Sequence, residues 1–434
     1  MALFSGILKQ LKSPQAKAIG IYTFSNFLNK GVSFLFLFYF AHALTESDFG
    51  LLNLFGSGML FLMPFISMGI TQSVNTDFFK LDKKEFKDFF TTTLLMPFVV
   101  MIMAIIILYS FRGQLMQRYS VPVVIIILVP INTFFNFLGE ELICLVRNNE
   151  QAGKYLLIGI GGLLIELGLA VFCISVLKYG WIGRVIGISV SGLLTVVYAF
   201  IYFKKQGFIF GKIVKKYIYK ELIYSVPIII MQISIFCMNS SSGYFIKYFT
   251  KDYASVGVYS IAATFASIVM VLSSALLHYF YPKIYRLLSE KETNYVAVRQ
   301  NFLYYAGAML LCTILVIAIT PIAYVVALKK SYFPGLKYYY FICIGYFLWS
   351  ITFFFYSFML YHKMKRRILY VSLIAIFISL ASDYFFIKNY GSFGAAVSIC
   401  TIYFLVLLVT LLFGRKQIVP ILQGKQIKNS NTHY

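Results

Sequence analysis

The chain alternates between long apolar runs and short polar stretches. Most runs extend for about 20 residues, and the stretches between them carry most of the Lys and Arg residues. A helix rises 1.5 Å per residue, so about 20 apolar residues cross a bilayer core of about 30 Å. The pattern therefore predicts about twelve transmembrane helices. Their expected ranges are 19–42, 50–76, 90–110, 121–143, 155–177, 181–203, 221–247, 253–281, 302–327, 335–360, 367–388 and 393–413.

Composition supports the same fold class. The 434 residues are 60% hydrophobic and 12% charged, whereas about a quarter of the residues in soluble proteins are charged. A soluble domain is therefore excluded, and we expect an all-α integral membrane protein. Pro64 and Pro130 lie inside apolar runs and predict kinks. The other prolines of the membrane region are expected near helix ends, namely Pro97, Pro122, Pro227, Pro282, Pro321 and Pro334.

The net charge of +23 is spread between the apolar runs rather than gathered in one basic domain, so nucleic acid is not an expected partner. The N-terminus, alternate loops and the C-terminus hold about 27 Lys and Arg residues, and the other loops about 10. The positive-inside rule therefore predicts that both termini are cytoplasmic. No short apolar core followed by a small-residue cleavage site opens the chain, so we expect no signal peptide.

Two segments recur at nearly one offset, which predicts a duplication. Tyr179–Gly183 opens the sixth helix as Tyr390–Gly394 opens the twelfth, and the turn Leu44–Gly50 corresponds to Phe249–Gly257. An even number of helices per repeat makes the repeats parallel, with a cavity between the halves. The predicted organisation is a six-helix bundle at 1–203, a basic cytoplasmic linker at 204–220, a second six-helix bundle at 221–414 and a basic cytoplasmic tail at 415–434.

Several of these residues also carry a family resemblance. Tyr22, Asn26 and Lys30 in the first helix, the Leu44–Gly50 turn and the late Tyr390–Gly394 segment resemble the polysaccharide-biosynthesis (Wzx-type) flippases of the multidrug/oligosaccharidyl-lipid/polysaccharide exporter superfamily. The resemblance implies two six-helix bundles forming a V. It also implies alternating-access export of an undecaprenyl-pyrophosphate-linked oligosaccharide, an O-antigen, capsule or exopolysaccharide unit, across the bacterial cytoplasmic (inner) membrane. Glycan polymerase and chain-length machinery are then candidate partners.

Polar side chains within the apolar runs are the candidates for binding this substrate, because a charge at mid-bilayer normally faces a cavity or a partner. Lys30 shares one helix face with Tyr22, Asn26 and Ser33 and suits a pyrophosphate. The alternatives are snorkelling or a structural pair with Glu166. The full set of predicted cavity residues is Lys30, Asn26, Asn53, Gln232, Asn239, Lys247, Ser274 and His278.

Acidic residues inside the helices are candidates for coupling transport to H⁺ or Na⁺. Glu166 lies in the middle of the fifth helix and Asp383 toward the end of the eleventh, while Glu140 and Glu141 close the fourth. A buried carboxylate can couple transport to an ion. The alternative interpretation is an internal ion pair or a helix cap.

Motifs of enzymes are absent from the sequence. There is no Gly-x4-Gly-Lys-Ser/Thr motif for ATP, no His/Cys/carboxylate cluster with metal-ligand spacing, and no cofactor is expected. The run Gly159–Gly162 lies in an apolar helix and indicates close helix packing. Two alternatives remain open: a cation-coupled drug antiporter of the same superfamily, and a membrane glycan polymerase or ligase, which would need a larger external loop.

Overall fold

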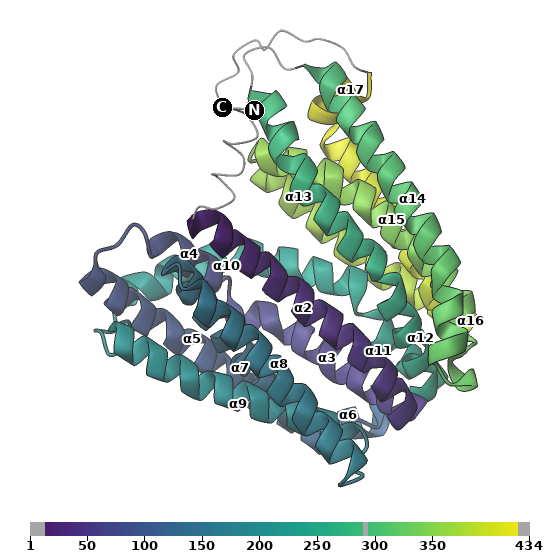
Figure 1. Ribbon diagram of the computed structural model, residues 1–434, viewed down its shortest axis with the longest axis horizontal. Coiled ribbons are helices and arrows are strands. Elements are labelled where there is room, and N and C mark those ends of the chain that lie inside the picture. The colour runs from purple at the N-terminus through teal and green to yellow at the C-terminus, as the bar shows by residue number, and fades with distance from the viewer. Residues whose placement is uncertain (1–13, 290–293, 424–434) are drawn as a thin grey trace. The chain divides into compact units, whose positions relative to one another are not determined.

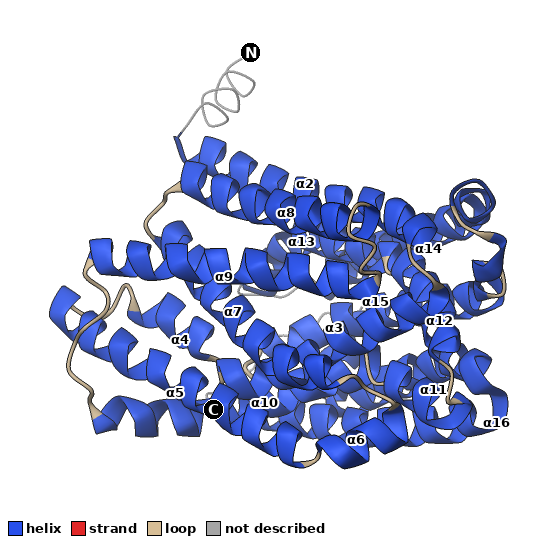
Figure 2. Ribbon diagram, turned by 90° about the horizontal axis from the view of Figure 1, so that it is seen from below, coloured by secondary structure: helices blue, strands red, loops and turns tan. Residues whose placement is uncertain are grey.

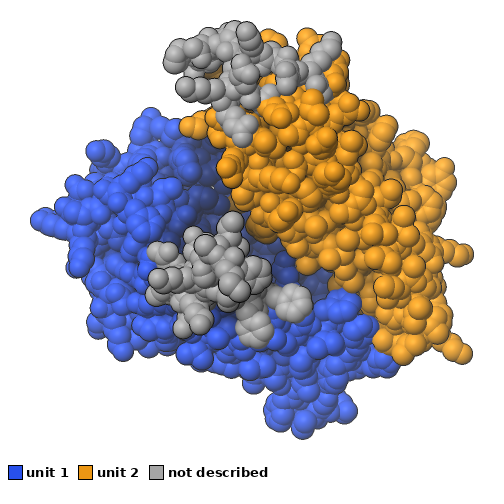
Figure 3. Space-filling view, turned by 45° about the horizontal axis from the view of Figure 1, so that its top comes forward, with its two compact units in different colours: residues 1–229 blue, residues 230–434 orange. Residues whose placement is uncertain are grey.

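A computed structural model describes residues 14–289 and 294–423, and every regular element within these ranges is a helix (Figures 1 and 2). The chain divides into two compact units, residues 1–229 and 230–434 (Figure 3). The first unit contains α2 (Pro14–Ala43), α3 (Glu46–Ser67), α4 (Ile70–Asp77), α5 (Lys83–Ser110), α6 (Arg112–Tyr119), α7 (Val123–Asn148), α8 (Ala152–Ser175), α9 (Trp181–Gln206) and the part of α10 (Lys215–Asn239) up to residue 229. The second contains the rest of α10, α11 (Ser242–Thr250), α12 (Tyr253–Ala266), α13 (Ile268–Ser289), α14 (Tyr295–Ala327), the 3₁₀ helix η1 (Lys330–Tyr332), α15 (Gly335–Tyr361), α16 (Lys365–Phe413) and α17 (Arg415–Gln423).

The number of membrane spans follows from helix length and apolarity. Ten segments of the described chain are long and apolar enough to cross a membrane. One of them, α16, has 49 residues, about twice the length of a single span, and its backbone is non-helical at Gly391. Counting α16 as two spans and adding α2, whose 30 residues extend about 45 Å, gives twelve. The prediction of a twelve-helix, all-α membrane protein is confirmed.

Three predicted helices are each divided into two shorter ones. The second span breaks at Met68 and Gly69, both in the left-handed region, one turn after Pro64. The seventh breaks between α10 and α11, and the eighth between α12 and α13. The kink expected from Pro64 is therefore present, but the breaks in the seventh and eighth spans were not predicted.

Prolines mark helix ends less often than predicted. Pro122 and Pro334 are N-cap residues, as expected. The other four, Pro97, Pro227, Pro282 and Pro321, lie inside α5, α10, α13 and α14. The prediction was wrong for Pro97, Pro227 and Pro282 because their helices extend beyond the apolar runs from which the ends were inferred, and Pro321 lies inside α14 although that helix ends at Ala327, as predicted. Pro130 lies inside α7, which continues through it without a break.

The predicted repeat is visible in the backbone. Gly180 has φ 55° and ψ −137°, and Gly391 has φ 57° and ψ −139°, a conformation that favours glycine. Three residues later, a Cβ on Gly183 would lie 2.9 Å from a side-chain carbon of Ile174, and one on Gly394 would lie 2.0 Å from the Phe386 carbonyl oxygen. Each Tyr-Gly-x2-Gly segment is therefore a tight hairpin between two closely packed helices.

The turn at Leu44–Gly50 is shorter than predicted, because α3 begins at Glu46 rather than at residue 50. Thr45 caps α3 by accepting a hydrogen bond from the Asp48 N–H, and the Asp48 carboxylate accepts one from the Thr45 N–H. Asp252 caps α12 in the same way, accepting from the N–H groups of Ala254 and Ser255. Both predicted repeat turns are thus helix starts fixed by a side-chain cap.

The basic linker is packed onto the first unit. Helix α9 ends at Gln206 and α10 begins at Lys215, so the irregular segment is residues 207–214. Its Lys212 N–H donates to Asp88 Oδ1 at 2.6 Å, and its Val214 N–H donates to Thr92 Oγ1 at 3.0 Å. Of the predicted termini, residues 1–13 and 424–434 lie outside the described residues, while 415–423 form α17.

Candidate functional sites

A polar cavity of about 420 Å³ lies within the first unit. Its polar lining includes Asn29 of α2, Glu140 of α7, Glu166 of α8 and Thr195 of α9. Gly159 of α8 also lines it, and a Cβ there would lie 3.0 Å from Asn29 Nδ2. The glycine therefore permits the close approach of α2 and α8, as the sequence predicted for this run.

Glu166 is neutralised within this unit by a residue other than Lys30. Arg184 Nη2 lies 2.7 Å from Glu166 Oε1, and the guanidinium carbon lies 5.0 Å from the Phe40 ring centroid. The two paired side chains are 26% and 20% exposed, so the pair is partly shielded from solvent. The interpretation of Lys30 as the structural partner of Glu166 was wrong, because Arg184 in the first turn of α9 pairs with this carboxylate.

The second unit encloses a carboxylate within a ring of hydroxyl groups. Asp383 of α16 is fully buried. It accepts hydrogen bonds from Ser241 at 2.6 Å, from Ser398 at 2.7 Å and from Ser242 at 3.0 Å. Ser241 and Ser242 lie where the seventh span breaks, so the positive end of the α11 dipole also faces this carboxylate. The oxygen-rich surroundings suit a proton or a hard monovalent cation.

A largely apolar cavity of about 330 Å³ lies in the same unit, with Trp349, Phe353 and Tyr356 among the residues that line it. Asn239 and Tyr403 supply a polar edge, where the Tyr403 hydroxyl donates to Asn239 Oδ1 at 2.6 Å. This cavity combines aromatic faces with one oriented amide, as sites for small organic groups commonly do.

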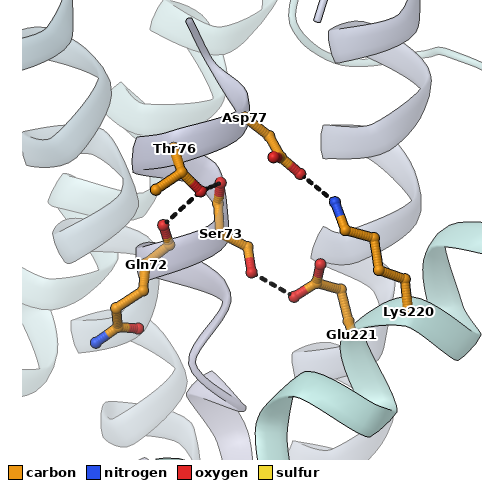
Figure 4. A network of polar contacts seen from close by, with 6 residues as sticks. All are labelled: Gln72, Ser73, Thr76, Asp77, Lys220 and Glu221. Atoms are coloured by element: carbon orange, nitrogen blue, oxygen red, sulfur yellow. Dashed lines mark hydrogen bonds and ion pairs between the residues drawn. The ribbon is translucent and has the colours of Figure 1, made fainter. Parts of the chain in front are cut away.

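A third polar cluster joins α4 to α7 and α10 within the first unit. Figure 4 shows Ser73 and Asp77 of α4 facing Glu221 and Lys220 of α10. Ser73 Oγ donates to Glu221 Oε2 at 2.7 Å, and Lys220 Nζ lies 2.5 Å from Asp77 Oδ2. Two residues before Ser73, Thr71 Oγ1 donates to Glu141 Oε1 at 2.7 Å. The short helix after the Gly69 break therefore holds two other spans through polar contacts.

The structure places the predicted substrate-binding residues of the first unit as follows. Lys30 lies near the middle of α2 with an exposed side chain, and it has no carboxylate partner in the described part of the chain. Asn53 is half-buried on α3. Asn26 lies on α2, but its side chain is outside the described residues. No described contact joins Lys30 to Asn53.

The predicted binding residues of the second unit do not form one group. Asn239 lines the aromatic cavity, while Ser274 donates to the carbonyl of Met270 in its own helix. His278 is exposed on α13, and Gln232 Oε1 is buried without a partner in the described residues. Lys247 is buried, donates to the Lys251 carbonyl at 3.0 Å and lies 3.7 Å from the Tyr253 ring centroid. Its partners are those of a structural lysine.

Sequence reasoning missed several residues that complete these sites. They are Arg184, Ser398, Tyr403, Glu221, Lys220 and Asp77. Arg184 carried a signal, as a basic residue directly after the Tyr-Gly-x2-Gly segment, but its partner is 18 positions away in sequence on another helix. Such pairings depend on which helices are neighbours, which periodicity alone does not reveal.

Comparison with solved structures shows the fold. The chain matches "Lipid II flippase MurJ, inward closed conformation" with a TM-score of 0.69 and 14% identity, covering 93% of this chain and 90% of that one. It matches "Inward-facing conformation of a multidrug resistance MATE family transporter of the MOP superfamily" with a TM-score of 0.66 and 14% identity, covering 89% and 95%. The Vibrio cholerae MATE transporter VcmN in the bent form matches with a TM-score of 0.50 and 14% identity, covering 95% of this chain and 99% of that one.

Comparison of sequences gives the family. No curated protein sequence matches the chain. Residues 16–288, more than half of the chain, match the family described as "Polysaccharide biosynthesis protein". The resemblance inferred from the sequence motifs is thereby confirmed. This multi-pass membrane protein, with the fold of the flippases and transporters of the superfamily, belongs to the polysaccharide biosynthesis protein family.

Proposed function

We propose that the protein is a flippase that moves an undecaprenyl-pyrophosphate-linked oligosaccharide from the inner to the outer leaflet of the bacterial cytoplasmic membrane by alternating access. Family membership supports a role in polysaccharide biosynthesis, and the likeness of the fold to a lipid II flippase supports a transport function. The proposed orientation has both termini in the cytoplasm, as the distribution of Lys and Arg predicts.

The observation that carries this proposal is the exposed side chain of Lys30. Helix α2 begins, in the described residues, at Pro14, which places Lys30 about 24 Å along a helix of about 45 Å. A charged group at this depth costs about 2.5–3.5 kcal/mol on insertion scales unless it meets water or an anion. Since Arg184 already neutralises Glu166, the ammonium group of Lys30 is free to meet the pyrophosphate of a lipid carrier.

The remaining proposed contacts are with the glycan. Asn26 shares a helical face with Lys30, and Asn53, Gln232, Ser274 and His278 offer groups that exchange hydrogen bonds with sugars. In the second unit, Asn239 beside Trp349 combines an amide with an aromatic face. Lys247 contributes least to this proposal, because its ammonium group already has two partners.

For ion coupling, the geometry favours Asp383 over Glu166. Glu166 has a permanent cationic partner in Arg184, so no mobile ion is needed to balance its charge. Asp383 has three hydroxyl donors and no cationic partner in the described residues. We therefore propose Asp383 as the H⁺ or Na⁺ site if transport is ion-coupled.

A cation-coupled multidrug antiporter is the second candidate function. The aromatic cavity near Asn239 favours it, because hydrophobic drugs bind mainly to apolar and aromatic surfaces. In that case, loss of the protein should raise drug sensitivity without changing surface glycan.

The test is complementation of a strain that lacks the gene. The wild-type protein should restore surface glycan, Lys30→Ala should lose most export at normal membrane abundance, and Lys30→Arg should retain part of it because the charge survives. Lys84→Ala, an exposed lysine in the first turn of α5, is the matched control and should export normally. Normal glycan export by Lys30→Ala would remove Lys30 from the site.

A further inference from the structure

A basic pocket of about 350 Å³ lies at one end of the second unit, and the proposed transport mechanism does not use it. Its lining consists of Arg367 near the start of α16, Leu412 and Phe413 at the end of α16, and Arg415 and Lys416 at the start of α17. Arg367 Nη1 donates to the Phe413 carbonyl oxygen at 3.0 Å. Three cationic side chains from two separate segments of the chain therefore meet around one concave surface.

The fold brings these segments together because α16 consists of two spans. Its backbone is non-helical at Gly391, where the chain reverses, so residues 365 and 413 lie at the same end of the second unit. Helix α17 follows directly and packs against α14, α15 and α16, with Ile418 and Ile421 buried. The first turns of α16 and α17 are thereby fixed next to each other.

The positive charge of the pocket is not balanced by the described protein. None of its three cationic side chains has a carboxylate partner in the described chain. From residue 294 to the end of the chain, Asp383 is the only acidic side chain. It lies about 24 Å along α16 from Arg367 and is enclosed by serine hydroxyl groups. Because like charges repel each other, the pocket favours an anion from outside the chain.

One side of the pocket is apolar. The Leu412 side chain is 66% exposed, and the Phe413 ring centroid lies 6.4 Å from that of Tyr370, which is 53% exposed. These residues belong to a helix that is apolar enough to cross a membrane, so their exposed faces meet lipid. On the other side, Arg415 and Lys416 open a short amphipathic helix, which is typical of the membrane surface. A ligand here therefore meets cations at one end and hydrocarbon at the other.

We propose that this pocket binds the phosphate group of an anionic phospholipid, with the acyl chains lying along Leu412 and Tyr370. A guanidinium has five N–H donors, and Arg367 uses one of them on the Phe413 carbonyl, so donors remain for two phosphate oxygens. Basic pockets between transmembrane helices bind such headgroups on the cytoplasmic side. The choice of leaflet rests on the orientation given under the proposed function, whereas binding itself does not depend on the transported substrate.

The size and the apolar side of the pocket favour a phospholipid over other anions. Its volume is near the lower end of the range of about 300–1,000 Å³ for ligand pockets, which suits a headgroup better than an oligosaccharide. A free phosphate ion would leave the apolar side without a ligand. A bound phosphate would contact the starts of both α16 and α17, so the lipid should hold α17 against the rest of the second unit.

Thermal unfolding of the full-length protein in neutral detergent micelles tests the binding. Phosphatidylglycerol should raise the melting temperature of the wild-type protein, whereas phosphatidylcholine with the same acyl chains and inorganic phosphate should not. The Arg415→Gln, Lys416→Gln double variant should need at least a tenfold higher phosphatidylglycerol concentration for the same shift. Both side chains are exposed, so its unfolding without lipid should be unchanged. The control is Lys337→Gln, Lys388→Gln, which removes two exposed lysines at the opposite end of α15 and beside Gly391.

Four results would overturn the proposal. The first is a wild-type protein that does not respond to phosphatidylglycerol, which is also the result expected if Glu290 or Glu292, outside the described residues, occupies the pocket. The second is an equal loss of response in the two double variants, which would indicate attraction to total charge. The third is an equal shift with inorganic phosphate, which would identify a site for a free anion. The fourth is a larger shift with undecaprenyl phosphate than with phosphatidylglycerol, which would assign the pocket to the lipid carrier.

Hydrogen exchange measured by mass spectrometry tests the effect of the lipid on α17. In the wild-type protein, peptides covering residues 415–423 should exchange several-fold more slowly in nanodiscs of phosphatidylglycerol than in nanodiscs of phosphatidylcholine. The Arg415→Gln, Lys416→Gln variant should exchange equally in both lipids, and Arg367→Lys should retain part of the difference because the charge survives. Equal exchange of the wild-type protein in both lipids would contradict the proposed bridge between α16 and α17.

Discussion

The ion pair between Arg184 and Glu166 should contribute measurably to stability, and it can be separated from any role of Lys30. Replacing Arg184 by Gln leaves Glu166 as a half-buried carboxylate without its cation. Breaking a fully buried pair costs about 3–5 kcal/mol and an exposed pair contributes about 0.2–1 kcal/mol. Because the two side chains are 20% and 26% exposed, we expect about 2 kcal/mol for Arg184→Gln, between these limits.

The assay is a double-mutant cycle on the free energy of unfolding in mixed micelles. Arg184→Gln and Glu166→Gln should each destabilise the protein, and the double variant should recover most of the loss, since neither charge is then stranded. Lys30→Gln is the control, because its side chain is exposed and has no carboxylate partner in the described chain. A coupling energy near zero between Arg184 and Glu166, or an equal coupling between Lys30 and Glu166, would refute the reasoning.

Three further predictions follow from local structure. Gly394→Ala should destabilise the protein by about 3 kcal/mol in thermal unfolding, because the added Cβ would lie 2.0 Å from the Phe386 carbonyl oxygen. Gly161→Ala is the control, because a Cβ there would have no atom within 4 Å, and it should be neutral or slightly stabilising in the same assay. Partial burial opposes ionisation of Asp252, but hydrogen bonds from Ser255 and Ala254 outweigh it and hold the pKa of Asp252 below its usual 3.8. Asp252→Ala should therefore lower the free energy of unfolding by about 1 kcal/mol at neutral pH. This difference between the variant and the wild type should be lost as the pH falls from 3.8 through the folded pKa of Asp252. A difference that does not change with pH would contradict the cap. Reporter fusions should place the Lys204–Lys220 segment in the cytoplasm and the Leu44–Phe49 turn outside, and a periplasmic signal from the former would exclude the even-helix topology.

The sequence predicted the spans and the hairpin glycines because both depend on local rules. Run length decides which segments cross a membrane, and the Tyr-Gly-x2-Gly segments require glycine at Gly180 and Gly391 wherever they occur. The break between α10 and α11 was not predictable in this way, since Ser240 and Ser241 are compatible with a continuous helix. It is stabilised by Asp383, which lies 142 positions from Ser241.

The candidate sites were predicted only in part, for the same reason. Periodicity identified Lys30, Glu166 and Asp383 as polar residues that the membrane must accommodate. It could not show that Glu166 pairs with Arg184, because that requires knowing that α8 and α9 lie side by side. The Glu221 contact to Ser73 depends on the packing of α10 against α4, and periodicity does not show which helices pack against each other.

Transport by the purified protein tests the central claim most directly. The protein would be reconstituted in liposomes that contain an undecaprenyl-pyrophosphate-linked oligosaccharide, and the glycan that reaches the opposite leaflet would be measured with a glycan-cleaving enzyme that cannot cross the bilayer. We expect the wild-type protein and Lys84→Ala to expose the glycan at equal rates, and Lys30→Ala to slow it at least tenfold, which corresponds to about 1.4 kcal/mol of lost interaction with the pyrophosphate. Absence of glycan movement by the wild-type protein, or equal rates for Lys30→Ala and the wild type, would contradict the account.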